Sequence, residues 1–166
     1  MYEKFGQFID GKWSPSSNKE TYEVINPATE EVLGHASKAS PADVERALKS
    51  AEKGLKVWKK TTPWDRSYIL RRIADKLREK KNVLAKWMTL ENGKPLAEGI
   101  GETNGAADIF EWNAEETKRI FGQTIESRSE DTRVHVYYQP VGVVAALSPW
   151  NFPLILAARK ISTALA

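Results

Sequence analysis

Residues 148–153, Ser-Pro-Trp-Asn-Phe-Pro, place a carboxamide, an indole ring and two prolines in one short segment. In open α/β sheets, ligands bind at the carboxyl ends of strands, and this segment follows a run of strand character. Two prolines stiffen the segment, so the Asn151 amide could be held in the fixed geometry that stabilisation of a developing oxyanion requires. A purely structural role is the alternative, in which Asn151 caps the next helix and Trp150 packs in the core.

The elements on either side of this segment would position it. Residues 141–147, Val-Gly-Val-Val-Ala-Ala-Leu, are continuously apolar, which predicts a parallel strand buried on both faces. From Pro153 the apolar residues recur at helical spacing, at Leu154, Ile155, Ala158, Ile161 and Leu165. Strand, tight loop and helix open a βαβ unit, whose strand needs a parallel neighbour from a later crossover. We therefore expect residues 1–166 to be an incomplete domain.

Short strands and loops are expected over residues 1–39. Gln7-Phe8-Ile9 and Lys12-Trp13 flank Asp10-Gly11, a signal for a two-residue hairpin turn of type I′. Tyr22 to Ile25 alternates like a strand and ends at Asn26-Pro27, a turn signal.

Three helices are expected over residues 40–122. The first starts at Ser40-Pro41-Ala42-Asp43, which offers an N-cap serine, a proline at the first helical position and an acid at the third. The second starts at Thr62-Pro63 and continues without a break to Asn92-Gly93, a left-handed C-cap. The third starts at Pro95 and runs to about Phe121, with Gly122 as its cap.

Residues 132–140 change the pattern from helical spacing to alternation. From Thr132 to Tyr138, Val134 and Val136 share one face with Tyr138, which predicts a half-exposed strand before Pro140.

Composition narrows the class of protein. Hydrophobic residues make up 41% and charged residues 28%, the net charge is +3, and the basic residues occur among acids and apolar residues. No nucleic-acid reader motif accompanies them, so nucleic-acid binding is not expected. No run of about 18 apolar residues occurs, and Met1 to Phe5 does not open a signal peptide, so we expect a cytoplasmic protein without a membrane span. The six tryptophans are expected to fill cores or interfaces.

Reactive side chains are few. The chain has no cysteine, which excludes disulfides, cysteine-bound zinc and a thiol nucleophile within these residues. His35 and His135 are far apart and lack ligand-like neighbours, so no metal site is expected. The glycine-rich run 99–105 lies inside a helical pattern with the wrong spacing for a phosphate loop, and its small residues should let helices approach. Glu115 and Arg119 should pair across one helical turn.

Several blocks occur in a specific order along the chain. They are Phe8-Ile9-Asp10-Gly11-Lys12-Trp13, Ile25-Asn26-Pro27-Ala28-Thr29, Trp58, Thr89-Leu90-Glu91-Asn92-Gly93-Lys94-Pro95, the run 141–154, Arg159-Lys160-Ile161 and Ala164-Leu165-Ala166. Together these blocks resemble the aldehyde dehydrogenase superfamily over nearly the whole chain. The resemblance implies an α/β fold: the N-terminal part of a Rossmann-type NAD(P)-binding domain, with an oligomerisation strand at 132–140 and the first parallel strand, active-site loop and helix at 141–166.

The resemblance also implies roles for individual residues. Asn151 corresponds to the family's oxyanion-hole asparagine. The nicotinamide-ribose side of NAD or NADP would lie along Leu147, Ser148, Pro149, Trp150 and Asn151. The wall of the aldehyde tunnel would include Phe152, Ile155 and Arg159. In the family, the cysteine nucleophile and the glutamate that activates water come later in sequence, so residues 1–166 alone are expected to be inactive.

Substrate and partners follow from finer features of the resemblance. Residues 110–119 and Arg159-Lys160 resemble the succinate-semialdehyde dehydrogenase branch. A guanidinium on the tunnel wall would pair with a distal carboxylate of the aldehyde, whereas a surface arginine is the alternative. The family forms dimers or tetramers, so a homo-oligomer is expected of the complete protein. The alternative function is a non-catalytic module that binds a partner through its exposed strand and unfinished helix.

Overall fold

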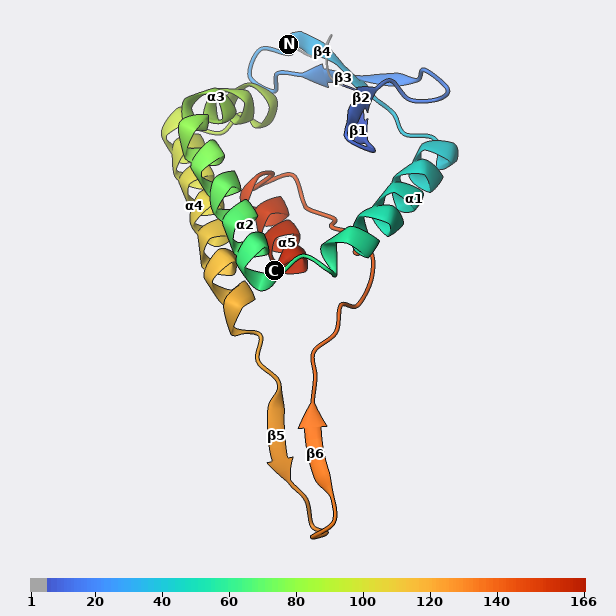
Figure 1. Cartoon of the computed structure of the whole chain (residues 1–166). Coiled ribbons are helices and arrows are strands. Elements are labelled where there is room, and N and C mark those ends of the chain that lie inside the picture. The colour runs from blue at the N-terminus through green and yellow to red at the C-terminus, as the bar shows by residue number, and fades with distance from the viewer. Residues whose placement is uncertain (1–5) are drawn as a thin grey trace.

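The computed structural model describes residues 6–166, an α/β structure with three two-stranded antiparallel sheets and five α-helices (Figure 1). The expectation about Met1 to Phe5 lies outside the described residues. None of the helices within 6–166 has both the length and the apolar character needed to cross a bilayer.

The first two sheets are hairpins near the N-terminus. Strands β1 (Gln7–Ile9) and β2 (Lys12–Ser14) pair as predicted, with φ values of 56° at Asp10 and 75° at Gly11, as a type I′ turn requires. The Phe8 and Trp13 rings face each other across the strands with centroids 5.1 Å apart. The predicted strand β3 (Thr21–Ile25) pairs with β4 (Val32–Ser37), which the sequence analysis did not anticipate.

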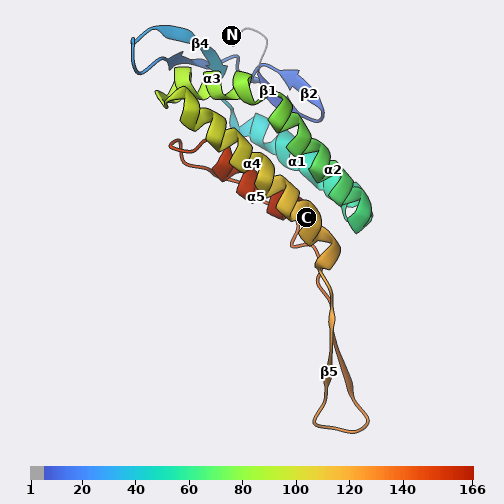
Figure 2. The ribbon, with the colours of Figure 1, turned by 90° about the vertical axis from the view of Figure 1, so that its left-hand side faces the viewer.

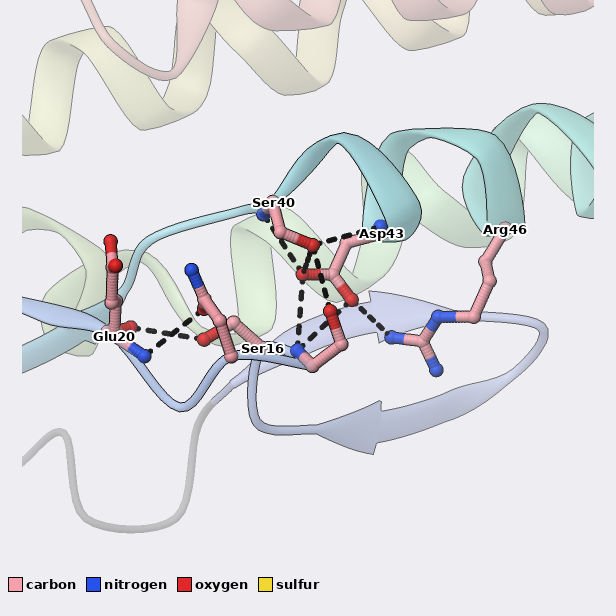
Figure 3. A network of polar contacts seen from close by, with 7 residues as sticks. Ser16, Glu20, Ser40, Asp43 and Arg46 are labelled. Atoms are coloured by element: carbon pink, nitrogen blue, oxygen red, sulfur yellow. Dashed lines mark hydrogen bonds and ion pairs between the residues drawn. The ribbon is translucent and has the colours of Figure 1, made fainter.

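Helix α1 (Pro41–Trp58) begins with the predicted cap. The Asp43 side chain in its first turn also bonds the loop between β2 and β3 (Figure 3). The Asp43 carboxylate is 1% exposed and accepts the backbone N–H groups of Ser40 and Ser17. Arg46 donates to the same carboxylate over 2.7 Å. The Ser40 backbone N–H is the largest cause that holds the pKa of Asp43 well below its ordinary value of 3.8, and the Ser17 N–H and Arg46 add to it.

The remaining helices pack around α4 (Leu96–Glu116). Helix α2 (Pro63–Glu79) lies against one side of it and α5 (Ile155–Leu165) against another, as both views of the ribbon show (Figures 1 and 2). The residues buried between these helices are mostly small: Leu70, Ala74, Ala106, Ala107, Phe110, Ala114 and Ala158. Small side chains let the helix axes approach closely, so α5 is fixed firmly to α4.

The glycines of the run 99–105 do allow close helix approach. A Cβ at Gly99 would lie 3.0 Å from the Ala85 carbonyl oxygen on α3 (Lys81–Asn92), and one at Gly105 would lie 2.9 Å from Ile155 Cδ1 on α5. The interpretation of this run as a packing feature is therefore confirmed at these two positions.

The second predicted helix is in fact two helices. Lys80 leaves helical geometry with φ −96° and ψ 8°, so α2 ends at Glu79 and α3 starts at Lys81. The break lets α3 take a new direction, which brings Ala85 against Gly99 of α4. Gly93, with φ 76°, ends α3 as predicted.

The third predicted helix is shorter than expected. Helix α4 ends at Glu116 and a 3-10 turn follows over Thr117–Arg119, where the buried Thr117 hydroxyl donates to the Ala166 carbonyl oxygen. Gly122 has no positive φ and so is not a left-handed cap, and its lack of a side chain instead lets the Val136 carbonyl oxygen approach closely. The predicted Glu115–Arg119 pair is also wrong: Arg119 bonds Glu116 at 2.8 Å, and Glu115 bonds Lys118 at 3.0 Å.

Strands β5 (Gln123–Glu126) and β6 (Arg133–Val136) form a hairpin that extends away from the helices as an arm (Figure 1). Strand β6 matches the predicted half-exposed strand, and β5 was not anticipated.

Two expectations about burial differ from the structure, the first wholly and the second in part. Residues 141–147 form no strand, and Val141 is 92% exposed, because no strand among the described residues runs beside them to take their backbone hydrogen bonds. Four of the six tryptophans, Trp13, Trp64, Trp112 and Trp150, are exposed and so do not fill the core, while a place at an interface stays a prediction. The alanine-lined contacts around α4 leave no room for an indole ring.

Candidate active site

The loop between residue 147 and α5 is hydrogen-bonded by side chains from the junction between α3 and α4. This junction carries Asn92 at the end of α3, Lys94 after the left-handed Gly93, and Glu102 in the second turn of α4. All three side chains bond to the backbone of the loop or of the helix that follows it.

Glu102 caps α5 from a neighbouring helix. Its Oε1 atom accepts the backbone N–H groups of Leu154 at 2.9 Å and Ile155 at 3.1 Å. The first N–H groups of a helix have no partner within the helix, and its positive N-terminal end favours a carboxylate. No side chain of the loop itself provides this cap. The start of α5 is therefore fixed to α4.

Lys94 connects this cap to Asn151. Its ammonium group forms an ion pair with Glu102 Oε2, donates to the Asn151 carbonyl oxygen at 3.0 Å, and lies 3.9 Å from the centre of the Phe152 ring. Lys94 is 7% exposed and Glu102 is 5% exposed. Charges buried this far are stable only when they are paired and hydrogen-bonded, and both conditions hold here.

Two further bonds fix the backbone of the loop. The Asn92 side chain donates to the Trp150 carbonyl oxygen at 3.0 Å, and the Lys160 ammonium donates to the Leu147 carbonyl oxygen. The loop is therefore held through its main chain. Its side chains remain exposed, with Leu147 at 81% and Trp150 at 79%, and Ser148, Pro149 and Asn151 are exposed as well.

The structural alternative for this loop is wrong on both points. Glu102, rather than Asn151, caps α5, and Trp150 lies at the surface rather than in the core. The Asn151 side chain forms no hydrogen bond with any of residues 6–166, and its carboxamide is left facing solvent.

The residues predicted to contact substrate lie on or just after this loop. Phe152 rests against Lys94, and Ile155 is partly buried against Gly105 of α4. Arg159 is four residues after Ile155, on the same side of α5, and is exposed. Among the described residues, no carboxylate pairs with its guanidinium.

A pocket of about 350 Å³ lies between α3 and the loop. Its lining is mainly apolar and consists of Leu84, Trp87, Met88, Glu91, Asn92, Trp150, Pro153 and Leu154. No group of three or more potential metal-binding side chains occurs within residues 6–166.

Sequence reasoning did not assign the roles of Lys94 and Glu102. Lys94 was noted only as part of a block, and Glu102 only as a member of the glycine-rich run. Their partners are 57 and 52 residues away, at Asn151 and Leu154, so no local spacing reveals these bonds. The charged Glu102 within a run of small, packing residues is the one signal that could have been followed.

The pattern of the Aldehyde dehydrogenase family matches residues 13–166, and the chain belongs to this family.

Individual relatives support the same assignment. The chain is 45% identical over 159 residues to a glutarate-semialdehyde dehydrogenase of Pseudomonas aeruginosa, covering 96% of this chain and 33% of that protein. It is 43% identical over 158 residues to a succinate-semialdehyde dehydrogenase [NADP(+)] of Escherichia coli, covering 95% of this chain and 33% of that protein.

Solved structures show the same arrangement. An NADP dependent enzyme of E. coli superposes with a TM-score of 0.92 at 43% identity, over 95% of this chain and 33% of that one. Betaine aldehyde dehydrogenase of Staphylococcus aureus, in complex with NAD+, superposes with a TM-score of 0.93 at 36% identity, over 98% of this chain and 33% of that one. The chain thus spans about a third of the length of these relatives.

Proposed function

We propose that residues 1–166 are the N-terminal, oxyanion-holding part of an NAD(P)-dependent dehydrogenase that oxidises a semialdehyde to the carboxylic acid. The observation that carries this proposal is the Asn151 carboxamide, which is exposed on a loop whose backbone is bonded by Asn92, Lys94 and Lys160. An amide held in this way can stabilise charge without reorganising during the reaction.

In the proposed reaction, a cysteine thiolate from outside residues 1–166 adds to the aldehyde carbon. The aldehyde oxygen, which becomes negatively charged, accepts a hydrogen bond from the Asn151 side-chain amide. When bound, NAD(P)+ would accept the hydride from the carbon of this cysteine adduct, which would leave a thioester, and water activated by a glutamate would then release the acid and the free thiol. The part played by the present chain is to hold the donor at Asn151 and to shape the walls beside it.

The loop suits one end of a dinucleotide. Leu147 and Trp150 present exposed apolar side chains, and their carbonyl oxygens are already bonded by Lys160 and Asn92. Such a surface fits the flat nicotinamide and its ribose. Within residues 6–166 no glycine-rich turn follows a strand, so the phosphates would be held by residues outside this chain. The E. coli and S. aureus relatives are described with NADP and NAD+ respectively.

The first prediction concerns Asn151 in the complete dehydrogenase. Asn151→Ala should lower kcat about 100- to 1,000-fold, as expected on losing one oxyanion donor. Rates of aldehyde-dependent NAD(P)H formation would measure this. Residues 1–166 alone should form no NAD(P)H, because they contain no cysteine. Activity of the isolated 166 residues, or an unaltered kcat in the variant, would contradict the proposal.

The second prediction concerns the substrate. The names of several relatives refer to aldehydes or related compounds with a distal acid: glutarate semialdehyde, succinate semialdehyde and 3-sulfolactaldehyde. The unpaired guanidinium of Arg159 could bind such an anion as a fork. Arg159→Leu should raise KM for succinate semialdehyde about 10-fold or more, with a much smaller change for an uncharged aldehyde of similar length. Equal changes in KM for both aldehydes would show that Arg159 does not bind the distal acid of the substrate.

The third prediction concerns assembly. The β5–β6 arm extends away from the helices, and Tyr137 and Tyr138 beyond it are exposed, so we propose that it pairs with another copy in a homo-oligomer. Replacing residues 123–136 with a short turn should reduce the mass of the complete protein in light scattering to that of a smaller assembly. An unchanged mass would show that the oligomer forms through other surfaces.

A further inference from the structure

We propose that the buried Lys94–Glu102 pair is a positioning device that sets the orientation of the Asn151 carboxamide. This inference rests on the proposed role of Asn151 as the oxyanion donor. Neither Lys94 nor Glu102 would touch the reacting atoms, so both would act through the loop.

The pair holds the chain at the catalytic residue itself and again just after it. Lys94 fixes the Asn151 carbonyl oxygen at 3.0 Å, and Glu102 fixes the N–H groups of Leu154 and Ile155 at 2.9 and 3.1 Å. Because the ion pair joins Lys94 to Glu102, the loop carbonyl and the helix start are bonded to one connected unit. Phe152 and Pro153, the two residues between these points, therefore have little freedom to move.

The Asn151 side chain depends on this support. It forms no side-chain hydrogen bond with the described residues, so nothing in this part of the protein orients the amide except the backbone that carries it. Phe152, the next residue, lies with its ring 3.9 Å from the Lys94 ammonium, which adds a second contact beside the loop. A shift of Lys94 would therefore be passed directly to Asn151.

A stabilising role alone does not explain the choice of residues. A buried ion pair contributes little stability relative to apolar residues of similar size, whereas loss of one partner leaves an unpaired buried charge. In this pair, each charged group has hydrogen bonds left over after the ion pair, and these bonds go to the loop and to the first turn of α5. The arrangement is suited to fixing the position of the loop.

Three variants of the complete dehydrogenase separate position from stability. Lys94→Met and Glu102→Gln each leave one buried charge unpaired, so both should lower Tm. The double variant Lys94→Met/Glu102→Gln has no buried charge, and the glutamine oxygen can still cap α5, so Tm should recover most of the loss. Its Asn151 carbonyl still lacks the lysine donor, so kcat should stay about 10- to 100-fold below the parent, with KM nearly unchanged.

The outcomes decide between the two roles. Recovery of Tm without recovery of kcat supports the positioning role, and recovery of both together overturns it. Asp43→Asn is the matched control, because Asp43 is also a buried carboxylate at a helix start but has no contact with the loop. This control should lower Tm and leave kcat unchanged.

Hydrogen exchange keeps this test separate from the proposed function. Should the complete parent protein form no NAD(P)H from any aldehyde, the proposed function fails, and amide exchange over residues 148–155 then decides the structural inference. Faster exchange there in the double variant, with α4 unaffected, supports positioning of the loop by Lys94. Unchanged exchange over residues 148–155 overturns it.

Discussion

Asp43 and Glu102 are both buried carboxylates that bond the N–H groups at the start of a helix, and they differ in where their partners come from. Asp43 bonds Ser40 and Arg46, each three residues away, and reaches one distant segment at Ser17 (Figure 3). Glu102 bonds Lys94, eight residues away, and the N–H groups of residues 52 and 53 positions later.

The two carboxylates therefore differ in which helix they cap and in whether they support the loop that carries Asn151. The Asp43 carboxylate starts its own helix and bonds Ser17 in the loop between β2 and β3, which is far from Asn151 in sequence. The Glu102 carboxylate starts a helix other than its own and, through Lys94, holds the loop that carries Asn151. Both carboxylates join segments that are distant in sequence, but only the Glu102 contacts extend to the loop that carries Asn151.

The largest effect on stability is expected for Glu102→Ala. The substitution leaves the Lys94 ammonium buried without its anion and removes the cap of α5. Losing one partner of a buried ion pair costs about 3–5 kcal/mol, so the free energy of unfolding should fall by that amount. Urea unfolding followed by circular dichroism would measure the change.

Glu98→Ala is the matched control for this prediction. Glu98 is an exposed acid in the first turn of the same helix, so its loss should change the free energy of unfolding by less than about 0.5 kcal/mol. Similar losses of unfolding free energy in the two variants would show that the buried Glu102 stabilises the protein no more than an exposed acid does. Glu102 would then not differ from Asp43 in joining distant segments through a buried ion pair that stabilises the fold.

The sequence predicted the parts of this fold whose causes lie within a few residues. The Asp10-Gly11 turn, the Ser40–Asp43 cap and the left-handed Gly93 were all confirmed, because each depends on one residue's φ or on a bond across three positions. The loop before a helix at residues 148–153 was also predicted, whereas the sequence left open whether Asn151 would be exposed or would cap that helix.

Features whose causes lie far apart in the chain were not predicted. The break at Lys80 allows Ala85 to contact Gly99, and at the end of α4 the Thr117 side chain bonds Ala166. The run 141–147 has the composition of a buried strand, but a strand forms only where a neighbour accepts its hydrogen bonds. The support of Asn151 by Lys94 belongs to the same class, because the two residues meet only in the folded chain.

The smaller effect is expected at Asp43, and it should depend on pH. The depressed pKa means that the folded protein binds fewer protons at this carboxyl than the unfolded chain does in mildly acidic solution. The stabilisation is therefore fully present above the ordinary pKa of 3.8 and is lost as the pH falls toward the lower folded value. Asparagine cannot titrate, so the difference in unfolding free energy between parent and Asp43→Asn should be largest at neutral pH and shrink between about pH 5 and pH 2.

Urea midpoints of both proteins across this pH range would measure the difference, with Ser40→Ala as the control. Ser40→Ala removes only the hydroxyl of the cap and should cost about 1 kcal/mol. It keeps the backbone N–H groups of Ser40 and Ser17 and the Arg46 guanidinium on the carboxylate, so most of the acid sensitivity should remain. A constant gap between parent and Asp43→Asn at every pH would show that the Asp43 charge adds nothing beyond its hydrogen bonds. The local cap would then resemble a neutral one, and only the Glu102 carboxylate would act through its charge.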